Sequence, residues 1–260
     1  MNAPTPLRKM GTRPTQFSAE EWELRQELAA AYRIVDYMGW SMVIFNHITV
    51  RVPGPEHHFL INPYGLRYDE VTASNLVKID LKGNIVGNAD WPVNPAGFTI
   101  HSAIHQNVPD ALCVIHTHTR EGLAVACKKD GLRNTNFYSC MLQGYIAYHN
   151  FEGLTVRDDE GPRLVESIGK APIVILRNHG LLAHGRTVAE AFSRMWTLQL
   201  ACEAQVLADS MQGETIPVTQ EATFYSTRDA ELFNPEKTCG QATFDALVRL
   251  MDQRDPSFRN

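Results

Sequence analysis

Cys113-Val114-Ile115-His116-Thr117-His118-Thr119 is the stretch from which the fold and the chemistry of this sequence can be predicted. Residues 112–115 are apolar or β-branched, which indicates a buried β-strand. Because successive side chains of a strand point to opposite faces, His116 and His118 share one face, and Thr117 points to the other. Cys113 lies at an odd spacing from His116 and also faces away. The stretch therefore predicts two imidazoles side by side where a strand meets solvent.

A second segment, Arg177-Asn178-His179-Gly180, supplies a third imidazole. His179 follows an apolar run at 172–176, and Gly180 would let a ligand approach the backbone closely. Three neutral imidazoles with one open position are a usual ligand set for catalytic Zn²⁺, and they also bind other divalent first-row metals such as Mn²⁺, Co²⁺ or Fe²⁺. A single His at a strand end is more often a half-buried, hydrogen-bonded residue, but a same-face pair with a third His is a less ordinary coincidence. We predict a metal site formed by His116, His118 and His179.

Composition restricts the class of protein. The chain has 260 residues, a hydrophobic fraction of 44% and a net charge of −5, which are typical of a folded protein and give no electrostatic footprint for nucleic acid. No apolar run approaches the roughly 18 residues of a membrane span, and residues 1–11 lack the apolar core of a signal peptide. The 5 cysteines are scattered without a CxxC pair, as expected for reduced thiols. We expect a cytoplasmic protein that binds neither nucleic acid nor membrane.

Hydrophobic periodicity and capping signals predict alternating helices and strands. Ser18 followed by Glu21 forms a capping-box pattern that starts an amphipathic helix ending at Gly39. Residues 136–153 show no clear periodicity, and we interpret them as irregular. The other predicted helices lie within 94–110 and at 119–128, 162–168, 188–211 and 242–252. The predicted strands lie at 47–52, 58–61, 77–80, 84–86, 112–115, 172–176 and 180–184.

Several other side chains are candidates for chemistry. His101 and His105 lie one turn apart on the helix that leads into the His116 strand, so His101 could act beside the metal as a hydrogen-bond donor or acid-base group. Tyr145 and His149 lie in the irregular stretch and could line a pocket. For each of these two residues, a role in packing, with the polar end of the side chain in contact with water, fits the pattern at least as well. The histidines at 47, 57 and 58 are interpreted as surface or strand residues.

Three motifs stand out along the chain: Phe59-Leu60-Ile61-Asn62-Pro63-Tyr64-Gly65-Leu66, Asn94-Pro95-Ala96-Gly97-Phe98-Thr99-Ile100-His101-Ser102-Ala103-Ile104, and His116-Thr117-His118 with Asn178-His179-Gly180. With these motifs the chain resembles the class II aldolase/adducin family, closest to the adducin head domain and its bacterial relatives. The resemblance extends from about Ser18 to Met211. It implies an α/β fold of three layers, α/β/α, with a mostly antiparallel central sheet, and commonly a fourfold-symmetric tetramer with pockets at subunit boundaries.

The chain is expected to divide into three parts, of which the resemblance covers the central one. Residues 18–211 would form the class II aldolase/adducin-like domain. Residues 1–17, with three prolines, are expected to be a flexible N-terminal arm. Residues 212–260 are expected to be a C-terminal extension that packs on the same domain or on a neighbouring subunit, and 223–238 are expected to order only against another subunit.

The resemblance also implies residue roles. In the sugar-phosphate aldolases of this family, three histidines matching His116, His118 and His179 bind zinc, and the metal stabilises an enediolate. Those aldolases carry an acidic residue where this chain has Gly97, so a carboxylate base is absent there. Their phosphate-binding segments correspond to residues 45–48 and 62–65. This correspondence assigns substrate contacts to Asn46, Asn62, Tyr64 and Gly65, although Tyr64 would crowd a phosphate.

These features lead to two hypotheses. The first is a metal-dependent lyase, decarboxylase-like or aldolase-like, that acts on a small carboxylate or carbonyl substrate by Lewis-acid stabilisation of an enolate or carbanion. Decarboxylation of hydroxy-aromatic acids, known in some family members, needs no carboxylate base, but it needs a proton donor, for which His101, Tyr145 and His149 are candidates. The second is a non-catalytic, metal-containing oligomeric scaffold of the adducin-head type, which Gly97 and Tyr64 favour.

Overall fold

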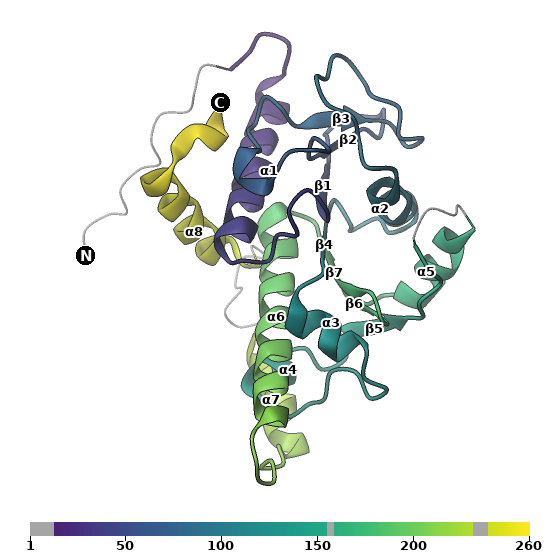
Figure 1. The fold of residues 1–260 in the computed structure, drawn as a ribbon, viewed down its shortest axis with the longest axis vertical. Helices are drawn as coiled ribbons and strands as arrows, with labels where there is room; N and C mark the ends of the chain where they lie inside the picture. Colours follow the sequence, from purple (N-terminus) through teal and green to yellow (C-terminus); the bar gives the residue numbers. More distant parts are fainter. Residues whose placement is uncertain (1–12, 155–158, 231–238) are drawn as a thin grey trace.

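The fold is organised around one mixed β-sheet of seven strands (Figure 1). The computed structural model describes residues 13–154, 159–230 and 239–260. The strand order is β3-β2-β1-β4-β7-β6-β5, and every neighbouring pair is antiparallel except β5 and β6. The mostly antiparallel sheet is thus confirmed. The strands are β1 (His47–Arg51), β2 (Phe59–Ile61), β3 (Val77–Ile79), β4 (Cys113–Thr117), β5 (Ile146–His149), β6 (Ile173–Leu176) and β7 (Gly180–Gly185).

Helices cover both faces of the sheet, which confirms the three-layer α/β/α prediction. One face packs mainly against α1, α3 and α6, with α8 packed on the outer side of α1 and α6, and the other face lies beneath α2 and α5 (Figure 1). The described helices are α1 (Ala19–Tyr37), α2 (Pro95–Asn107), α3 (Arg120–Ala126), α4 (Phe137–Met141), α5 (Glu160–Ile168), α6 (Val188–Ser210), α7 (Gln220–Ala230) and α8 (Gln241–Arg254), with short 3₁₀ turns at Tyr68–Glu70 and Pro256–Arg259.

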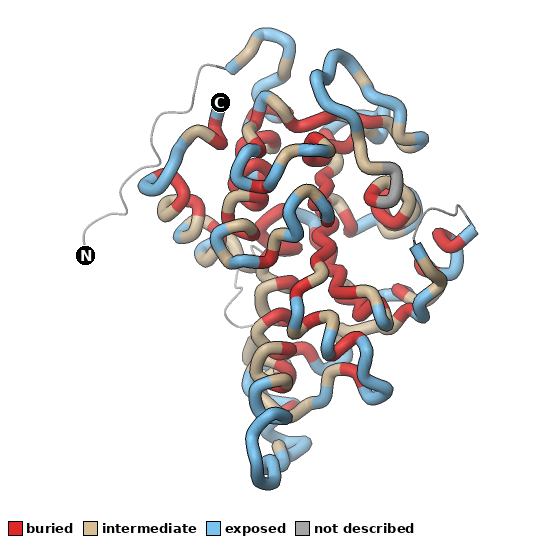
Figure 2. The backbone as a smooth tube through the Cα atoms, in the orientation of Figure 1, coloured by how far each residue is buried: buried red, intermediate tan, exposed pale blue. Residues whose placement is uncertain are grey.

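Strand alternation sends apolar residues to both faces of the sheet, where the described residues form three separate buried clusters. Ile48 and Ile115 belong to the core beneath α1 and α6, whereas Val114 and Leu182 belong to the smaller core beneath α2 and α5. Figure 2 shows the buried residues along the central strands and the exposed ones on the loops and at the far end of α6. Because both faces are covered, the central strands are apolar almost throughout, and their polar residues are conspicuous.

Helix α1 begins where the sequence predicts, but its capping box forms only in part. The Glu21 backbone N–H donates to Ser18 Oγ at 3.1 Å. The Glu21 carboxylate does not turn back to the cap; it accepts hydrogen bonds from Arg25 Nε and Lys78 Nζ, both at 2.9 Å. This buried carboxylate therefore ties α1 to β3, a tertiary contact that the local motif does not reveal.

The stretch 136–153, interpreted from sequence as irregular, contains helix α4 and strand β5, so that interpretation is wrong. The Asn136 side chain caps α4 by accepting hydrogen bonds from the backbone N–H groups of Tyr138 and Ser139 at 3.1 and 3.0 Å. Strand β5 pairs in parallel with β6. The predicted second strand at 84–86 is reduced to an isolated bridge between Ile79 and Ile85.

The described part of the C-terminal region packs against the same chain. Helix α7 contacts α4, and α8 contacts α1 and α6. Within α7, the Thr227 hydroxyl donates to the Cys140 carbonyl at 2.8 Å. Residues 1–12 of the predicted arm and 231–238 lie outside the described residues, and the proposed domain boundaries stay predictions. Across the described ranges, no helix is both long and apolar enough to cross a membrane.

Candidate metal centre

The fold brings the three predicted metal ligands together at one end of the sheet. His116 lies on β4, His118 directly follows it, and His179 occupies the turn between β6 and β7. One ring nitrogen from each can be chosen so that all three lie within 4.8 Å of one another. The Nε2 atoms of His116 and His118 are 2.7 Å apart. This is the convergence of nitrogen atoms that a divalent cation requires.

The protonated nitrogen of His116 can be assigned from its partner. His116 Nδ1 is 2.8 Å from the Leu181 carbonyl oxygen. A carbonyl only accepts, so Nδ1 carries the proton, and neutral His116 presents the Nε2 lone pair to the other rings. A hydrogen bond from the far ring nitrogen to a carbonyl is the usual way a protein orients a metal-binding imidazole.

Burial keeps these imidazoles neutral. It is the main cause that lowers the pKa of His116 well below its usual value, with further lowering by the neighbouring His179 and His118. Burial likewise lowers the pKa of His179 to about 4, again reinforced by His118. Only the neutral ring has a lone pair to give to a metal, so the site is prepared for a cation at neutral pH.

Two backbone features position the third histidine, His179. A Cβ added to Gly180 would lie 2.4 Å from the Thr117 carbonyl oxygen and 2.9 Å from the His118 ring, so only glycine lets β7 come this close to β4. Asn178 has a φ of 58°, a conformation that asparagine tolerates better than most residues. Together they turn the chain so that His179 faces the other two histidines.

His47 is a residue of this centre that the sequence interpretation missed. It lies directly opposite His116 in the β1–β4 register, and the two ring centroids are 5.7 Å apart. It is a strand residue, as predicted, but it is buried and not on the surface, with 5% exposure. Neither ring nitrogen has a hydrogen-bond partner among the described residues. The signal for it lay in the pairing of strands, which its own sequence neighbourhood does not specify.

The His47 ring occupies the space above Gly97. A Cβ built on Gly97 would lie 2.6 Å from His47 Nδ1, closer than real Cβ atoms come to other atoms. A carboxylate side chain at position 97 is therefore incompatible with His47 in its present place. The His47 imidazole therefore occupies the space into which a side chain at position 97 would extend.

The three candidate catalytic residues are not equally placed. His101 on α2 is buried, and its ring lies 4.3 Å from that of His47, so one imidazole separates it from His116. His149 is directed toward α5, with Nδ1 2.9 Å from Ser167 Oγ and Nε2 3.7 Å from a Glu160 oxygen. Tyr145 lies half-buried just before β5. Their catalytic roles stay predictions.

The candidate substrate contacts divide in a similar way. Asn46, at a φ of 65°, is buried with both side-chain polar atoms unpaired among the described residues. Asn62 Oδ1 already accepts the Tyr32 hydroxyl at 3.0 Å. Tyr64 lies near Phe45, with ring centroids 6.3 Å apart. Gly65 has a φ of 109° and packs beside the Trp91 ring. Of the four candidate contacts, Asn46 is the one that is next to His47 and has side-chain polar atoms without a partner among the described residues.

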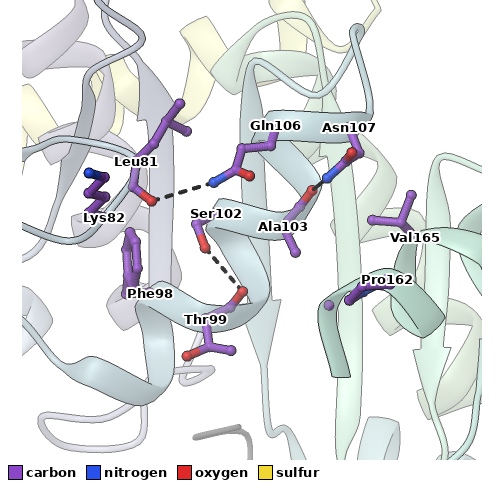
Figure 3. A pocket seen from close by; sticks show the side chains of 11 residues that line it. Leu81, Lys82, Phe98, Thr99, Ser102, Ala103, Gln106, Asn107, Pro162 and Val165 are labelled. Atoms are coloured by element: carbon purple, nitrogen blue, oxygen red, sulfur yellow. Dashed lines mark hydrogen bonds between the residues drawn. The ribbon is translucent and has the colours of Figure 1, made fainter. Parts of the chain in front are cut away.

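A separate groove lies between α2, α5 and the segment after β3 (Figure 3). Its volume is 660 Å³, and none of the candidate site residues lines it. Its polar side chains are partly engaged within the chain, since Gln106 donates to the Leu81 carbonyl at 3.4 Å and Ser102 to the Thr99 carbonyl at 3.2 Å. The groove and the histidine centre are therefore different sites.

Comparisons with known proteins agree on one family. The family model described as "Class II Aldolase and Adducin N-terminal domain" matches residues 26–206. Alpha-adducin of Rattus norvegicus is 39% identical over 262 residues, covering 95% of this chain and 36% of adducin. The crystal structure of an aldolase II superfamily protein from Pseudomonas syringae is 39% identical, with a TM-score of 0.86 over 94% of this chain and 98% of that one.

An L-fuculose 1-phosphate aldolase from Glaciozyma antarctica PI12 is more distant, at 28% identity. Its TM-score is 0.82, and the match covers 96% of this chain and 98% of the aldolase. The family model covers most of the chain, and the whole fold is shared. Membership in one family therefore explains both the sequence motifs and the arrangement of the sheet. The chain belongs to the class II aldolase and adducin family.

Proposed function

We propose that this protein is a metal-dependent carbon–carbon lyase, aldolase-like or decarboxylase-like, acting on a small carboxylate or carbonyl substrate. The observation that carries the proposal is the convergence of His116, His118 and His179 with ring nitrogens within 4.8 Å. The similarity to an L-fuculose 1-phosphate aldolase over nearly the whole chain supports it.

The three imidazoles fit a divalent cation such as Zn²⁺, Mn²⁺, Co²⁺ or Fe²⁺. They are held neutral by burial, and the Leu181 carbonyl leaves His116 Nε2 free to bind. A cation there would supply Lewis-acid stabilisation of negative charge that develops on substrate oxygens. Three imidazoles accept several first-row metals. The proposal therefore names the binding site and a divalent cation, without choosing among these metals.

The residues around the three ligands determine which version of the chemistry is favoured. Gly97 offers no carboxylate to remove a carbon-bound proton, and His47 fills that space. Decarboxylation needs no such base, because loss of CO₂ itself leaves the carbanion. The proton that must then be delivered would come from a donor near the centre. His101 lies beside His47, but burial holds its ring neutral and its Nδ1 is engaged with Thr49, so Tyr145 and His149 are the candidates favoured as donors. These features favour a decarboxylase-like over an aldolase-like reaction.

Two further expectations belong to this proposal. We propose that the protein forms a homotetramer or another homo-oligomer, with pockets near subunit boundaries. Substrate contacts would come from Asn46, Asn62, Tyr64 and Gly65. Light scattering of the purified protein tests the assembly directly: a monomer mass of 29.2 kDa at micromolar concentration would contradict it.

A different class of function has its own support. The 39% identity to alpha-adducin, together with the missing acidic side chain at Gly97, favours a non-catalytic, oligomeric scaffold in which the histidines hold a structural metal. A scaffold predicts bound metal without turnover. The two functions therefore differ in activity and not in metal content.

The experiment that separates them is a substrate screen with the metal-loaded protein. Hydroxy-aromatic carboxylates, β-keto acids and ketose phosphates are incubated with wild type, His179→Ala and His57→Ala, the last being an exposed histidine outside the centre. The enzyme proposal expects turnover that a chelator abolishes, that His179→Ala lacks and that His57→Ala retains. No turnover of any substrate class by protein with bound metal would support the scaffold.

A further inference from the structure

A series of hydrogen bonds runs from a backbone carbonyl to the ring of His101. His105 Nδ1 is 2.7 Å from the Ala111 carbonyl oxygen, and His105 Nε2 is 2.7 Å from Thr49 Oγ1. Thr49 Oγ1 is in turn 2.6 Å from His101 Nδ1. All four groups belong to buried residues. The series therefore lies inside the protein, where no bulk water competes for its hydrogen bonds.

The carbonyl at one end fixes the direction of every bond. Because the Ala111 carbonyl only accepts, His105 Nδ1 donates, and in a neutral ring Nε2 is then an acceptor. The Thr49 hydroxyl has one proton, which it donates to His105 Nε2. Its oxygen must then accept from His101 Nδ1. The proton of neutral His101 is thus on Nδ1, and Nε2 carries an unshared lone pair.

The neutrality of His105, on which this direction depends, has physical causes. Burial lowers the pKa of His105 to about 3, and the nearby Arg51 guanidinium disfavours a second positive charge. Arg51 also donates a short hydrogen bond to the His105 carbonyl. Burial also lowers the pKa of His101 well below its usual value. Both rings are therefore neutral at pH 7, and the hydrogen bonds determine which nitrogen of each ring carries the proton.

His101 Nε2 has no hydrogen-bond partner among the described residues, although His101 is only 1% exposed. Leaving a buried acceptor unpaired is destabilising, so such an atom indicates a partner that arrives with a ligand. The ring contacts His47, which neighbours His116. The unused lone pair therefore belongs to the surroundings of the histidine centre.

We infer that Thr49 and His105 are positioning residues that set the tautomer of His101, so that His101 Nε2 accepts a hydrogen bond from a hydroxyl group of the substrate. The second half of this inference rests on the proposed function, whereas the tautomer itself does not. A lone pair repels a carboxylate oxygen and pairs with a hydroxyl, so the arrangement selects for a hydroxyl-bearing substrate. The sequence pattern behind it is a stripe on α2, at 97, 101 and 105, that faces residues 47, 49 and 51 of β1.

The tautomer is tested by NMR of the protein labelled with ¹⁵N-histidine, in which Nδ1–H and Nε2–H rings have different nitrogen shifts. The His101 signals are assigned by their loss in His101→Gln. We expect wild type and Thr49→Ser, which keeps the hydroxyl, to show the proton on Nδ1. Thr49→Val should move a large share of it to Nε2. Thr223→Val, a buried threonine in α7, is the control and should leave the spectrum unchanged.

Kinetics test the role in recognition. With a substrate found in the screen, Thr49→Val should lower kcat/KM for the hydroxylated compound about five- to tenfold, the effect of one neutral hydrogen bond. It should change kcat/KM for the deoxy analogue less than twofold, and Thr49→Ser should restore the preference. Equal losses for both compounds would overturn the recognition role.

The two proposals fail in distinguishable ways. Wild-type protein with the His101 proton on Nε2, or a Thr49→Val spectrum identical to wild type, would overturn the assignment of Thr49 and His105 whatever the activity. A protein that turns over no substrate but shows the Nδ1 tautomer, lost in Thr49→Val, would contradict the proposed function and support the tautomer. Circular dichroism of each variant excludes unfolding as the cause.

Discussion

At the scale of single residues, the centre is defined by which nitrogen of each histidine carries a proton. The Leu181 and Ala111 carbonyls each accept from an imidazole Nδ1 and thereby leave Nε2 of the same ring as an acceptor. The backbone of the sheet and of the α2–β4 connection therefore sets the tautomers of imidazoles on β4 and α2. Fixed donors and acceptors of this kind cost no reorganisation when a ligand binds.

The close approach of His47 to Gly97 gives a prediction about stability. Gly97→Ala places a Cβ 2.6 Å from His47 Nδ1, and we expect it to destabilise the fold by about 1–3 kcal/mol, the usual cost of overpacking. Urea denaturation measures the loss.

The control is the same change in a His47→Ala background, where the ring is absent. There we expect Gly97→Ala to cost less than in wild type, with a coupling of at least about 0.5 kcal/mol between the two positions. Additive effects of the two substitutions would show that the ring and the glycine do not share this space.

The sequence predicted part of the centre at this scale because two of its ligands are local. His116 and His118 share a face through strand alternation alone, and His179 was marked by its apolar run and Gly180. The place of His47 depends on its register opposite His116, a pairing between segments some 70 residues apart. Periodicity within a strand indicates which face a residue occupies, but it does not indicate its partner.

At the scale of elements, α1 shows how a local signal and a tertiary contact share one residue. Its start was predicted from Ser18 and Glu21, and the backbone half of the motif is present. The carboxylate of Glu21 instead binds Arg25 and Lys78, and those two hydrogen bonds hold its pKa below the usual value against the effect of burial. The motif predicted the position of the helix start but not the partners of its acidic residue.

The cap of α1 can be tested by itself. Ser18→Ala removes the oxygen that accepts the Glu21 backbone N–H, and we expect a loss of about 1 kcal/mol in the free energy of unfolding. Ser18→Thr keeps an accepting oxygen and should lose much less. Equal stability of the alanine variant and wild type would mean that water replaces the cap.

The elements missed in the sequence owe their structure to distant partners. Helix α4 has only 5 residues, too few to be stable alone, and it packs between α6 and α7. Strand β5 has 4 residues and pairs in parallel with β6. Neither shows a periodic pattern long enough to predict, because tertiary packing and not local propensity stabilises them.

At the scale of the whole molecule, the three layers place a set of neutral histidines in the interior. The mostly antiparallel sheet was predicted from the family resemblance and not from periodicity, because alternation within strands does not specify which strands are neighbours. The observed strand order and register place His47, Thr49 and His116 on the face covered by α2. The interior is therefore sensitive to protonation, which gives a prediction about pH.

His105 has a pKa of about 3 in the folded protein, chiefly because it is buried, against about 6.5 when unfolded. Between these values the unfolded chain binds more protons, so this contribution is fully present above pH 6.5 and is lost as the pH falls toward 3. We expect the free energy of unfolding to decrease by about 1.4 kcal/mol per pH unit from this one group.

Urea denaturation of metal-free wild type and His105→Gln between pH 7.5 and 4.5 checks this. The variant lacks the titrating group, so below about pH 6.5 its stability should fall less steeply by about 1.4 kcal/mol per pH unit, and the other buried histidines should supply the remaining slope. Parallel curves for the two proteins would show that His105 is protonated at similar pH in the folded and unfolded states.

The claim on which the whole account depends is that one cation binds between His116, His118 and His179. Elemental analysis of purified wild type, of the three single His→Ala variants and of His57→Ala measures it directly. We predict about one divalent first-row metal per chain in wild type and in His57→Ala, and a loss of at least roughly tenfold in affinity in each ligand variant. Metal that stays at the wild-type level in His116→Ala and His179→Ala, or a wild-type protein that binds no metal after reconstitution, would contradict the account.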